Sequence, residues 1–187
     1  LKLMPRETDF PAFLNQLVDM FRPQAAEKGL SFDYVVEGEL PPGVRCDDKR
    51  LAQILINLLS NALKFTRSGG VTLAVDCRRE TTTFAVTDTG PGIAPEDLER
   101  VFQPFERAEG RAPGVGLGLT IARLLTQLMG GELTADSEPG RGSAFRVRLL
   151  LPKLQAVRSS ARALAPVVGY RSARRRLLVA DDEAAHR

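Results

Sequence analysis

The segment from Leu51 to Phe65 has apolar residues at the spacing of an α-helix and gathers polar residues on one flank. At about 100° per residue, one apolar stripe contains Leu51, Ile54, Leu55, Leu58, Ala62 and Phe65. Asn57, Asn61 and Lys64 then fall within about 60° of each other. Asparagine is a poor helix former, so two of them one turn apart inside a helix need a reason. A carboxamide oxygen can ligate Mg²⁺ and a lysine can bind phosphate, but a solvated polar face explains this helix equally well.

Two glycine-rich segments follow this helix. The first, Asp88 to Ile93, comes after an alternating run that predicts a strand, and it can offer a carboxylate where the backbone approaches a ligand closely. The second, Gly114 to Leu119, precedes an apolar-periodic helical segment, whose free N–H groups favour anions. Each segment alone can be an ordinary turn. Leu119 occupies the third glycine position of the dinucleotide fingerprint, and no phosphate loop of the G-x-x-x-x-G-K-[ST] type occurs.

In this order, the segments resemble the ATP-binding domain of sensor histidine kinases. Its nucleotide fold, the Bergerat-type fold, is shared with gyrase, the ninety-kilodalton heat-shock chaperone and the mismatch-repair ATPase. The resemblance covers roughly residues 5–152 and five motifs, which is far more specific than any one motif. The motifs are the asparagine box Asn57 to Phe65, the first glycine box Asp88 to Gly92, the phenylalanine box Phe102 to Phe105, the second glycine box Gly114 to Leu119, and the closing turn and strand Gly140 to Phe145.

The resemblance implies a role for each matching position. Asn61 is similar to the Mg²⁺ ligand, Asn57 and Lys64 to residues that hold the phosphates, and Arg107 to a lid arginine that reaches the terminal phosphate. Asp88 looks like the carboxylate that accepts a hydrogen bond from the adenine amino group. The remaining positions implied at the nucleotide are Gly90, Gly92, Ile93, Phe105, Gly114, Gly116, Leu117, Gly118, Leu119 and Ser143. Packing explains Phe102 and Phe105 better than contact with a ligand does, and an ordinary solvated charge is the alternative for Arg107.

One position separates the subfamilies. Hydrolytic members carry a glutamate one turn before the metal-binding asparagine, where this chain has Asn57. An amide cannot act as a general base at neutral pH, so we expect the site to present the γ-phosphate of Mg-ATP to another nucleophile. The expected function is that of a protein histidine kinase. The alternatives are a regulatory nucleotide-binding module without catalysis and an ATPase of the same superfamily.

The expected phosphoacceptor histidine is absent, because the single histidine is His186, close to the end of the sequence. The resemblance therefore implies a partner, a dimerisation hairpin outside this sequence. Residues 175–187 resemble the first strand of a receiver domain, with Asp181 and Asp182 as its acidic pair. We expect a catalytic domain at 1–152, a basic linker at 153–174 and the start of a receiver at 175–187, in a hybrid kinase.

Composition sets limits on partners and location. The net charge of +3 is modest, and the arginines of the expected linker lack interleaved aromatics, so we expect no nucleic-acid partner. No run approaches the ~20 apolar residues of a membrane span, and no signal peptide is visible. We expect a cytoplasmic fragment without membrane contact, and a parent protein anchored in the inner membrane is compatible with this. Cys46 and Cys77 have no metal-site spacing and read as small buried side chains.

The expected fold class is α/β, a two-layer sandwich with helices on one face of a mixed sheet. The 43% hydrophobic content suffices for its core. We expect helices at 10–28, 48–65, 95–100 and 117–129, the second one capped by Asp47 or Asp48. Strands are expected at 30–36, 71–78, 82–87, 132–136 and 143–151, and a short extended piece at 44–46. Residues 102–115 form the expected lid, and the polar stretch 106–113 is expected to be mobile without nucleotide.

Overall fold

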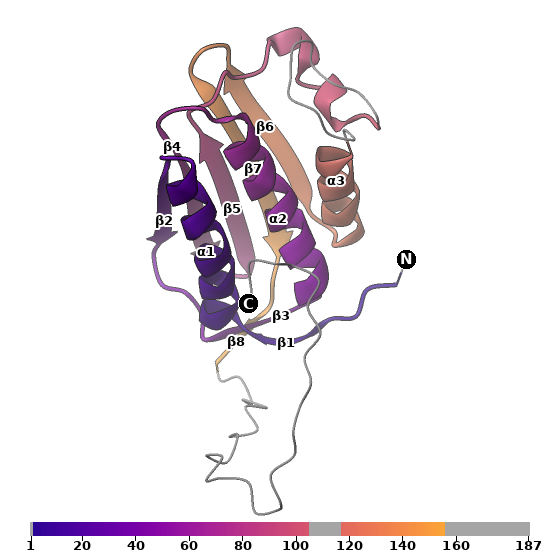
Figure 1. The fold of residues 1–187 in the computed structure, drawn as a ribbon. Coiled ribbons are helices and arrows are strands. Elements are labelled where there is room, and N and C mark those ends of the chain that lie inside the picture. Colours follow the sequence, from indigo (N-terminus) through magenta and orange to yellow (C-terminus); the bar gives the residue numbers. More distant parts are fainter. Residues whose placement is uncertain (1, 105–116, 156–187) are drawn as a thin grey trace, which may run out of the picture.

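A five-stranded sheet forms one layer of the computed structural model, which describes residues 2–104 and 117–155 (Figure 1). Its strand order is β2-β4-β5-β7-β6. Only β2 and β4 are parallel, so the sheet is mixed. The strands are β2 (Ser31–Glu37), β4 (Gly70–Arg78), β5 (Thr81–Asp88), β6 (Glu132–Glu138) and β7 (Gly142–Leu150).

Three helices cover one face of this sheet: α1 (Phe10–Glu27), α2 (Asp48–Phe65) and α3 (Gly118–Leu128) (Figure 1). This arrangement confirms the expected two-layer α/β sandwich. Asp47 is the residue that caps α2, because its side chain accepts a hydrogen bond from Arg50 N at 3.2 Å. Asp9 caps α1 in the same way, accepting from Ala12 N at 3.0 Å. Pro23 lies on the exposed side of α1, and the helix continues through it.

The core lies between the helices and the inner face of the sheet. The predicted stripe of α2 is buried from Leu51 to Ala62, whereas Phe65 at its end is only partly buried. Alternate residues of the central strands pack against this stripe from the sheet. Among them, Leu73, Phe84 and Val147 are 0% exposed. Each such side chain contributes roughly 1.5–3 kcal/mol by leaving water, so the stripe fixes which side of α2 faces outward.

A second, three-stranded sheet with the order β1-β3-β8 lies at the end of the domain away from the pocket described below (Figure 1). It consists of β1 (Arg6–Asp9), β3 (Gly43–Cys46) and β8 (Lys153–Leu154). Of this sheet the sequence predicted only an extended piece at β3, because β1 buries Thr8 alone and β8 has two residues, too few to show an alternation. Lys153, the first residue of the expected linker, pairs with Val44 in this sheet.

The expected helix at 95–100 is not an α-helix. The chain instead forms two 3₁₀ turns, η1 (Pro95–Asp97) and η2 (Arg100–Phe102). Short segments favour such turns, and here Val101 and Phe102 are drawn into the core. The rings of Phe102 and Phe145 pack edge to face, with their centroids 6.2 Å apart. Phe102 is therefore a core residue at the start of the expected lid.

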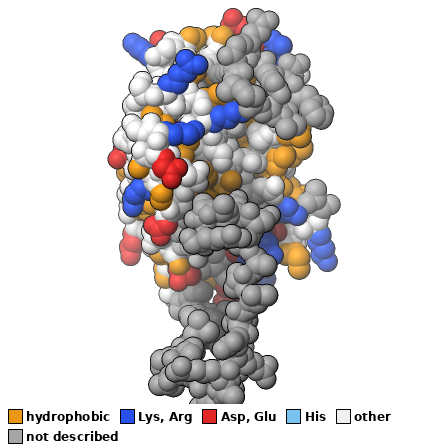
Figure 2. Space-filling model, in the orientation of Figure 1, with side chains coloured by type: hydrophobic (Ala, Val, Ile, Leu, Met, Phe, Trp, Pro, Cys, Tyr) orange, Lys and Arg blue, Asp and Glu red, His pale blue; other side chains and the backbone are white. Residues whose placement is uncertain are grey.

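Most of the expected lid, including Phe105, lies outside the described residues. Among the described helices, none is long and apolar enough to cross a membrane. Side chains of both charge signs occur on the described part of the face seen in Figure 2, and they lie among hydrophobic ones.

Candidate functional site

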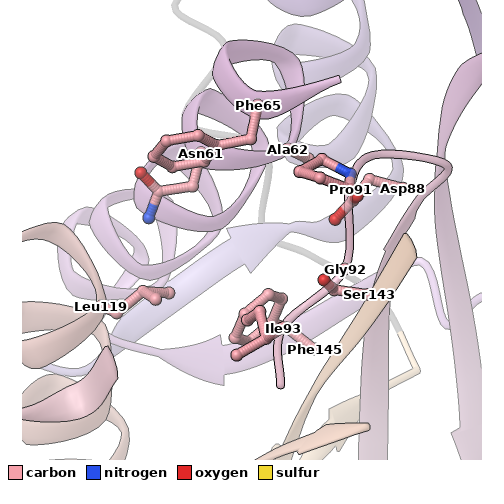
Figure 3. Close-up of a pocket in the computed structure, with 10 residues that line it drawn as sticks. All are labelled: Asn61, Ala62, Phe65, Asp88, Pro91, Gly92, Ile93, Leu119, Ser143 and Phe145. Atoms are coloured by element: carbon pink, nitrogen blue, oxygen red, sulfur yellow. The ribbon is translucent and has the colours of Figure 1, made fainter. Parts of the chain in front are cut away.

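A pocket lies where α2, α3, the loop after β5 and the start of β7 meet (Figure 3). It has an empty volume of about 330 Å³, part of which is open to solvent. Asn61 and Leu119 lie on one side of it, and Asp88 and Ser143 on the other (Figure 3). The residues that line it are Asn61, Ala62, Phe65, Asp88, Pro91, Gly92, Ile93, Leu119, Ser143 and Phe145. Two polar residues that the sequence separates by 27 positions therefore share one cavity.

Asp88 forms the buried polar end of the pocket. It is the last residue of β5, faces Ser143 across the strand pair and is 7% exposed. Its Oδ1 accepts a hydrogen bond from Gly90 N at 2.8 Å, which fixes the carboxylate against the turn that follows the strand. A buried carboxylate held in this way is suited to accept a hydrogen bond from a ligand.

Two glycines let the chain turn tightly around Asp88. Gly92 has a φ of +71°, and a Cβ there would lie 2.1 Å from Glu138 O. Gly142 has a φ of +105°, and its Cβ would lie 1.9 Å from Asp88 O. Both positions require glycine for the backbone itself. Gly90 is tight as well, because its Cβ would lie 2.7 Å from Asp88 Oδ1.

The polar flank of α2 faces the start of α3. A Cβ on Gly118 would lie 3.4 Å from Asn61 Nδ2 and 4.0 Å from Asn57 Oδ1, so both carboxamides lie beside the first turn of α3. Asn57 Nδ2 is buried and has no hydrogen-bond partner among the described residues. Lys64 is exposed, and its Nζ lies 5.2 Å from the centroid of the Phe65 ring, at the rim of the pocket.

Helix α3 begins without a side-chain cap. Leu117 occupies the cap position, and its side chain has no atom that could accept a hydrogen bond, so the first amides of α3 lack a capping side chain. Such amides carry the positive end of the helix dipole, which favours an anion beside Asn57 and Asn61.

The sequence did not reveal a polar network around Ser137, next to the Asp88–Ser143 strand pair. Ser137 in β6 accepts a hydrogen bond from Ile93 N at 2.7 Å. Its Oγ also lies 2.8 Å from Gly142 O and 2.9 Å from Ser143 Oγ. The predicted strand ended at Asp136, and a single serine beyond it looks like any surface serine. Its only signal is the position five residues before Gly142.

The structure thus brings together six of the expected site residues in the pocket lining: Asn61, Asp88, Gly92, Ile93, Leu119 and Ser143. Five others are close by without lining it, namely Asn57, Lys64, Gly90, Leu117 and Gly118. Phe105, Arg107, Gly114 and Gly116 lie outside the described residues. Lining residues without an expected binding role are Ala62, Phe65, Pro91 and Phe145.

An α/β sandwich with a pocket between its asparagine-bearing helix and a glycine turn defines a class of nucleotide-binding domains. Residues 46–153, more than half of the chain, match the family described as histidine kinase-, DNA gyrase B-, and HSP90-like ATPase. The chain belongs to this family, and it carries the ATP-binding catalytic domain of histidine kinases.

Relatives and solved structures agree with this assignment. The sensor histidine kinase RcsC of Salmonella typhimurium is 37% identical over 155 residues, which are 81% of this chain and 16% of RcsC. Full-length ShkA, in a crystal structure in complex with AMPPNP, is 35% identical with a TM-score of 0.76, over 83% of this chain and 33% of ShkA. The catalytic domain of the histidine kinase ThkA is 25% identical with a TM-score of 0.70, over 80% of this chain and 96% of that domain. The chain thus spans only a small part of RcsC and a third of ShkA.

Proposed function

We propose that this chain is the catalytic part of a hybrid sensor histidine kinase, which transfers the γ-phosphate of Mg-ATP to a histidine on a separate helical hairpin. The observation that carries the proposal is the pocket that joins Asn61 to Asp88. A site of this kind can hold a purine at one end and phosphates at the other. The complex of ShkA with AMPPNP, an ATP analogue, supports the same ligand here.

The base end is formed by Asp88, Gly92 and Ile93. Asp88 would accept a hydrogen bond from the adenine amino group, and the apolar wall of Ile93 and Phe145 would cover the ring. Gly90 and Gly92 would let the backbone pass close to the base. A Cβ at either position would also meet protein atoms, Asp88 Oδ1 at Gly90 and Glu138 O at Gly92.

The phosphate end is formed by the flank of α2 and the start of α3. The buried Asn57 Nδ2 lacks a partner among the described residues, and a phosphate oxygen would supply one. The uncapped amides of α3 and the exposed Lys64 would add positive potential. Arg107, Phe105, Gly114 and Gly116 are proposed to complete this end as parts of a lid.

The donor set fits Mg²⁺ held mainly by the nucleotide. No cluster of three or more histidines, cysteines or carboxylates occurs among the described residues, so a cage of protein ligands is not available there. The ion usually keeps several waters and takes phosphate oxygens with one or two protein oxygens. Asn61 Oδ1 is the proposed protein ligand. When bound, the ion would neutralise charge on the phosphates.

Asn57 favours transfer to another protein over hydrolysis. A carboxamide cannot take a proton from an attacking water, so the pocket would bind and orient ATP without activating a water molecule. The nucleophile is proposed to be the hairpin histidine. A receiver domain, whose first strand is proposed to begin near residue 175, would accept the phosphoryl group next. We propose that the domain works in the cytoplasm.

A transfer assay tests the proposal directly. The chain is mixed with γ-labelled ATP, Mg²⁺ and the separately expressed phosphoacceptor hairpin of the full-length kinase. We expect acid-labile, base-stable label on the hairpin, and its loss in Asn61→Ala but not in Ser60→Ala, an exposed neighbour on α2. ATP binding without any transfer would contradict the kinase proposal and favour a regulatory module, and rapid ATP hydrolysis by the chain alone would favour an ATPase.

A further inference from the structure

We infer that Ser137 is a positioning residue that fixes the base end of the pocket and sets Ser143 as a hydrogen-bond acceptor toward the ligand. The inference rests on the proposed function, because it concerns the same nucleotide site. Ser137 lies on β6 and does not line the pocket shown in Figure 3. It acts through two residues that do, Ile93 and Ser143.

The first argument comes from the hydrogen-bonding capacity of a serine. A hydroxyl has one proton to donate and two lone pairs to accept with. Gly142 O can only accept, so the 2.8 Å contact uses the Ser137 proton. Ile93 N–H can only donate, so the 2.7 Å contact uses one lone pair. The second lone pair then remains for Ser143.

The orientation of Ser143 follows from this count. Since Ser137 has no proton left, Ser143 must be the donor in the 2.9 Å contact between the two hydroxyls. Its proton therefore points at Ser137, which does not line the pocket. The lone pairs of Ser143, which is 8% exposed and lines the cavity, remain for the ligand side.

The result is a base end that presents acceptors. Asp88 contributes a carboxylate and Ser143 contributes lone pairs, so a donating edge such as an exocyclic amino group is favoured. Guanine has a carbonyl at the same position. Its oxygen, which can only accept, would face the acceptors of Asp88 and Ser143, and no hydrogen bond could form. Ser137 thus contributes to base selectivity without touching the base.

Ser137 also holds the loop that forms one wall of the pocket. The loop after β5 is attached to the β6–β7 hairpin at two points, Ile93 N to Ser137 Oγ and Gly140 N to Pro91 O at 2.8 Å. Gly92 lies between these points and packs directly on Glu138. Removal of the Ser137 hydroxyl would leave the Ile93 amide without its acceptor and loosen this wall.

The test uses Ser137→Ala, Ser137→Cys and Ser137→Thr, with Ser60→Ala as a matched control on an exposed site. Alanine removes the hydroxyl, cysteine keeps the size with a much weaker hydrogen-bonding group, and threonine keeps the hydroxyl. Titration calorimetry measures the dissociation constants for ATP and GTP, and the transfer assay gives KM and kcat. Circular dichroism confirms that each variant is folded.

We expect Ser137→Ala and Ser137→Cys to weaken ATP binding about tenfold, as for a lost hydrogen bond in the binding wall, and to reduce the preference for ATP over GTP. In the transfer assay, KM for ATP should rise in both variants, whereas kcat should stay within about twofold of the native value. Ser137→Thr should keep the native preference for ATP over GTP. A merely structural role would lower stability without changing the ratio of the two nucleotides.

Unchanged ATP affinity and unchanged selectivity in a folded Ser137→Ala or Ser137→Cys variant would overturn the inference while leaving the proposed function intact. If the native chain itself failed to bind ATP, the proposed function would fall, and this inference with it.

Discussion

Asn57, Asn61 and Asp88 are polar residues whose roles can be understood only from their surroundings in the folded domain. On the sequence alone, the α2 flank could be a solvated face. In the structure, Asn61 lines the pocket and Asn57 Nδ2 is buried without a partner among the described residues, which does not describe a solvated face. The chemistry of the two asparagines was predictable from their type and spacing, but their surroundings depend on α3, which begins more than fifty residues later in the sequence.

Cys46 shows the opposite case, a residue whose role is packing. It is 4% exposed, and its thiol contacts Thr8 Oγ1 at 3.7 Å. Burial raises the pKa of Cys46 from 9.0 to about 11. The sequence correctly favoured a small buried side chain over a reactive thiol, because no second ligand lay at a metal-site spacing.

This pKa predicts how stability changes in alkaline solution. Between pH 9 and about 11 the unfolded thiol loses its proton while the folded thiol keeps it, so the unfolded state binds fewer protons. The free energy of unfolding should therefore fall as pH rises through this window, and the Cys46 contribution is fully present below it. Urea unfolding at pH 8, 9, 10 and 11 measures the trend. In Cys46→Ala, the free energy of unfolding should fall less steeply with pH than in the native protein. An identical fall in both proteins would count against this account.

At the scale of elements, long periodic segments were predictable and short ones were not. The expected bounds of α2 agree with the structure at both ends, and α1 and the strands of the large sheet agree within two residues. The small sheet was missed because β1 and β8 gain their stability from pairing with β3 rather than from a pattern of their own. The segment 95–100 was expected as one short helix and instead forms two 3₁₀ turns, because its charged residues suit a helix while its length allows only turns.

Two glycines with similar backbone conformations allow a matched test of the glycine turn. Gly92 (φ +71°) packs on Glu138 O and lines the pocket, whereas Gly130 (φ +75°) has open space around its Cβ position. Gly130→Ala should cost about 1 kcal/mol, the penalty for a side chain in left-handed conformation, and leave ATP affinity unchanged. Gly92→Ala should cost more and also weaken ATP binding, because the loop must move away from β6. Thermal unfolding and calorimetry measure both quantities, and equal effects of the two substitutions would refute the proposed close approach.

At the scale of the whole molecule, the fold class was predictable because five motifs had to agree on one arrangement. Helices on one face of the sheet leave the glycine turn and the start of α3 at the same end of the domain, beside the polar flank of α2 (Figure 1). Local patterns could not reveal Ser137, since its three partners are brought together only by the pairing of β6 with β7 and the return of the loop after β5. The division into a catalytic domain, a linker and a receiver stays a prediction.

The central claim is that one pocket holds a purine at Asp88 and the metal-bound phosphates at Asn61, and calorimetric titration with ATP tests it most directly. Native chain, Asn61→Ala and Asp88→Ala are each titrated once with Mg²⁺ and once with a chelator. Asp88→Ala should weaken binding about tenfold to a hundredfold under both conditions, the cost of a lost hydrogen bond to a charged group. Asn61→Ala should remove most of the increase in ATP affinity that Mg²⁺ gives the native chain. In the presence of the chelator, its ATP affinity should be close to the native value. Native affinity in both variants under both conditions would contradict the account.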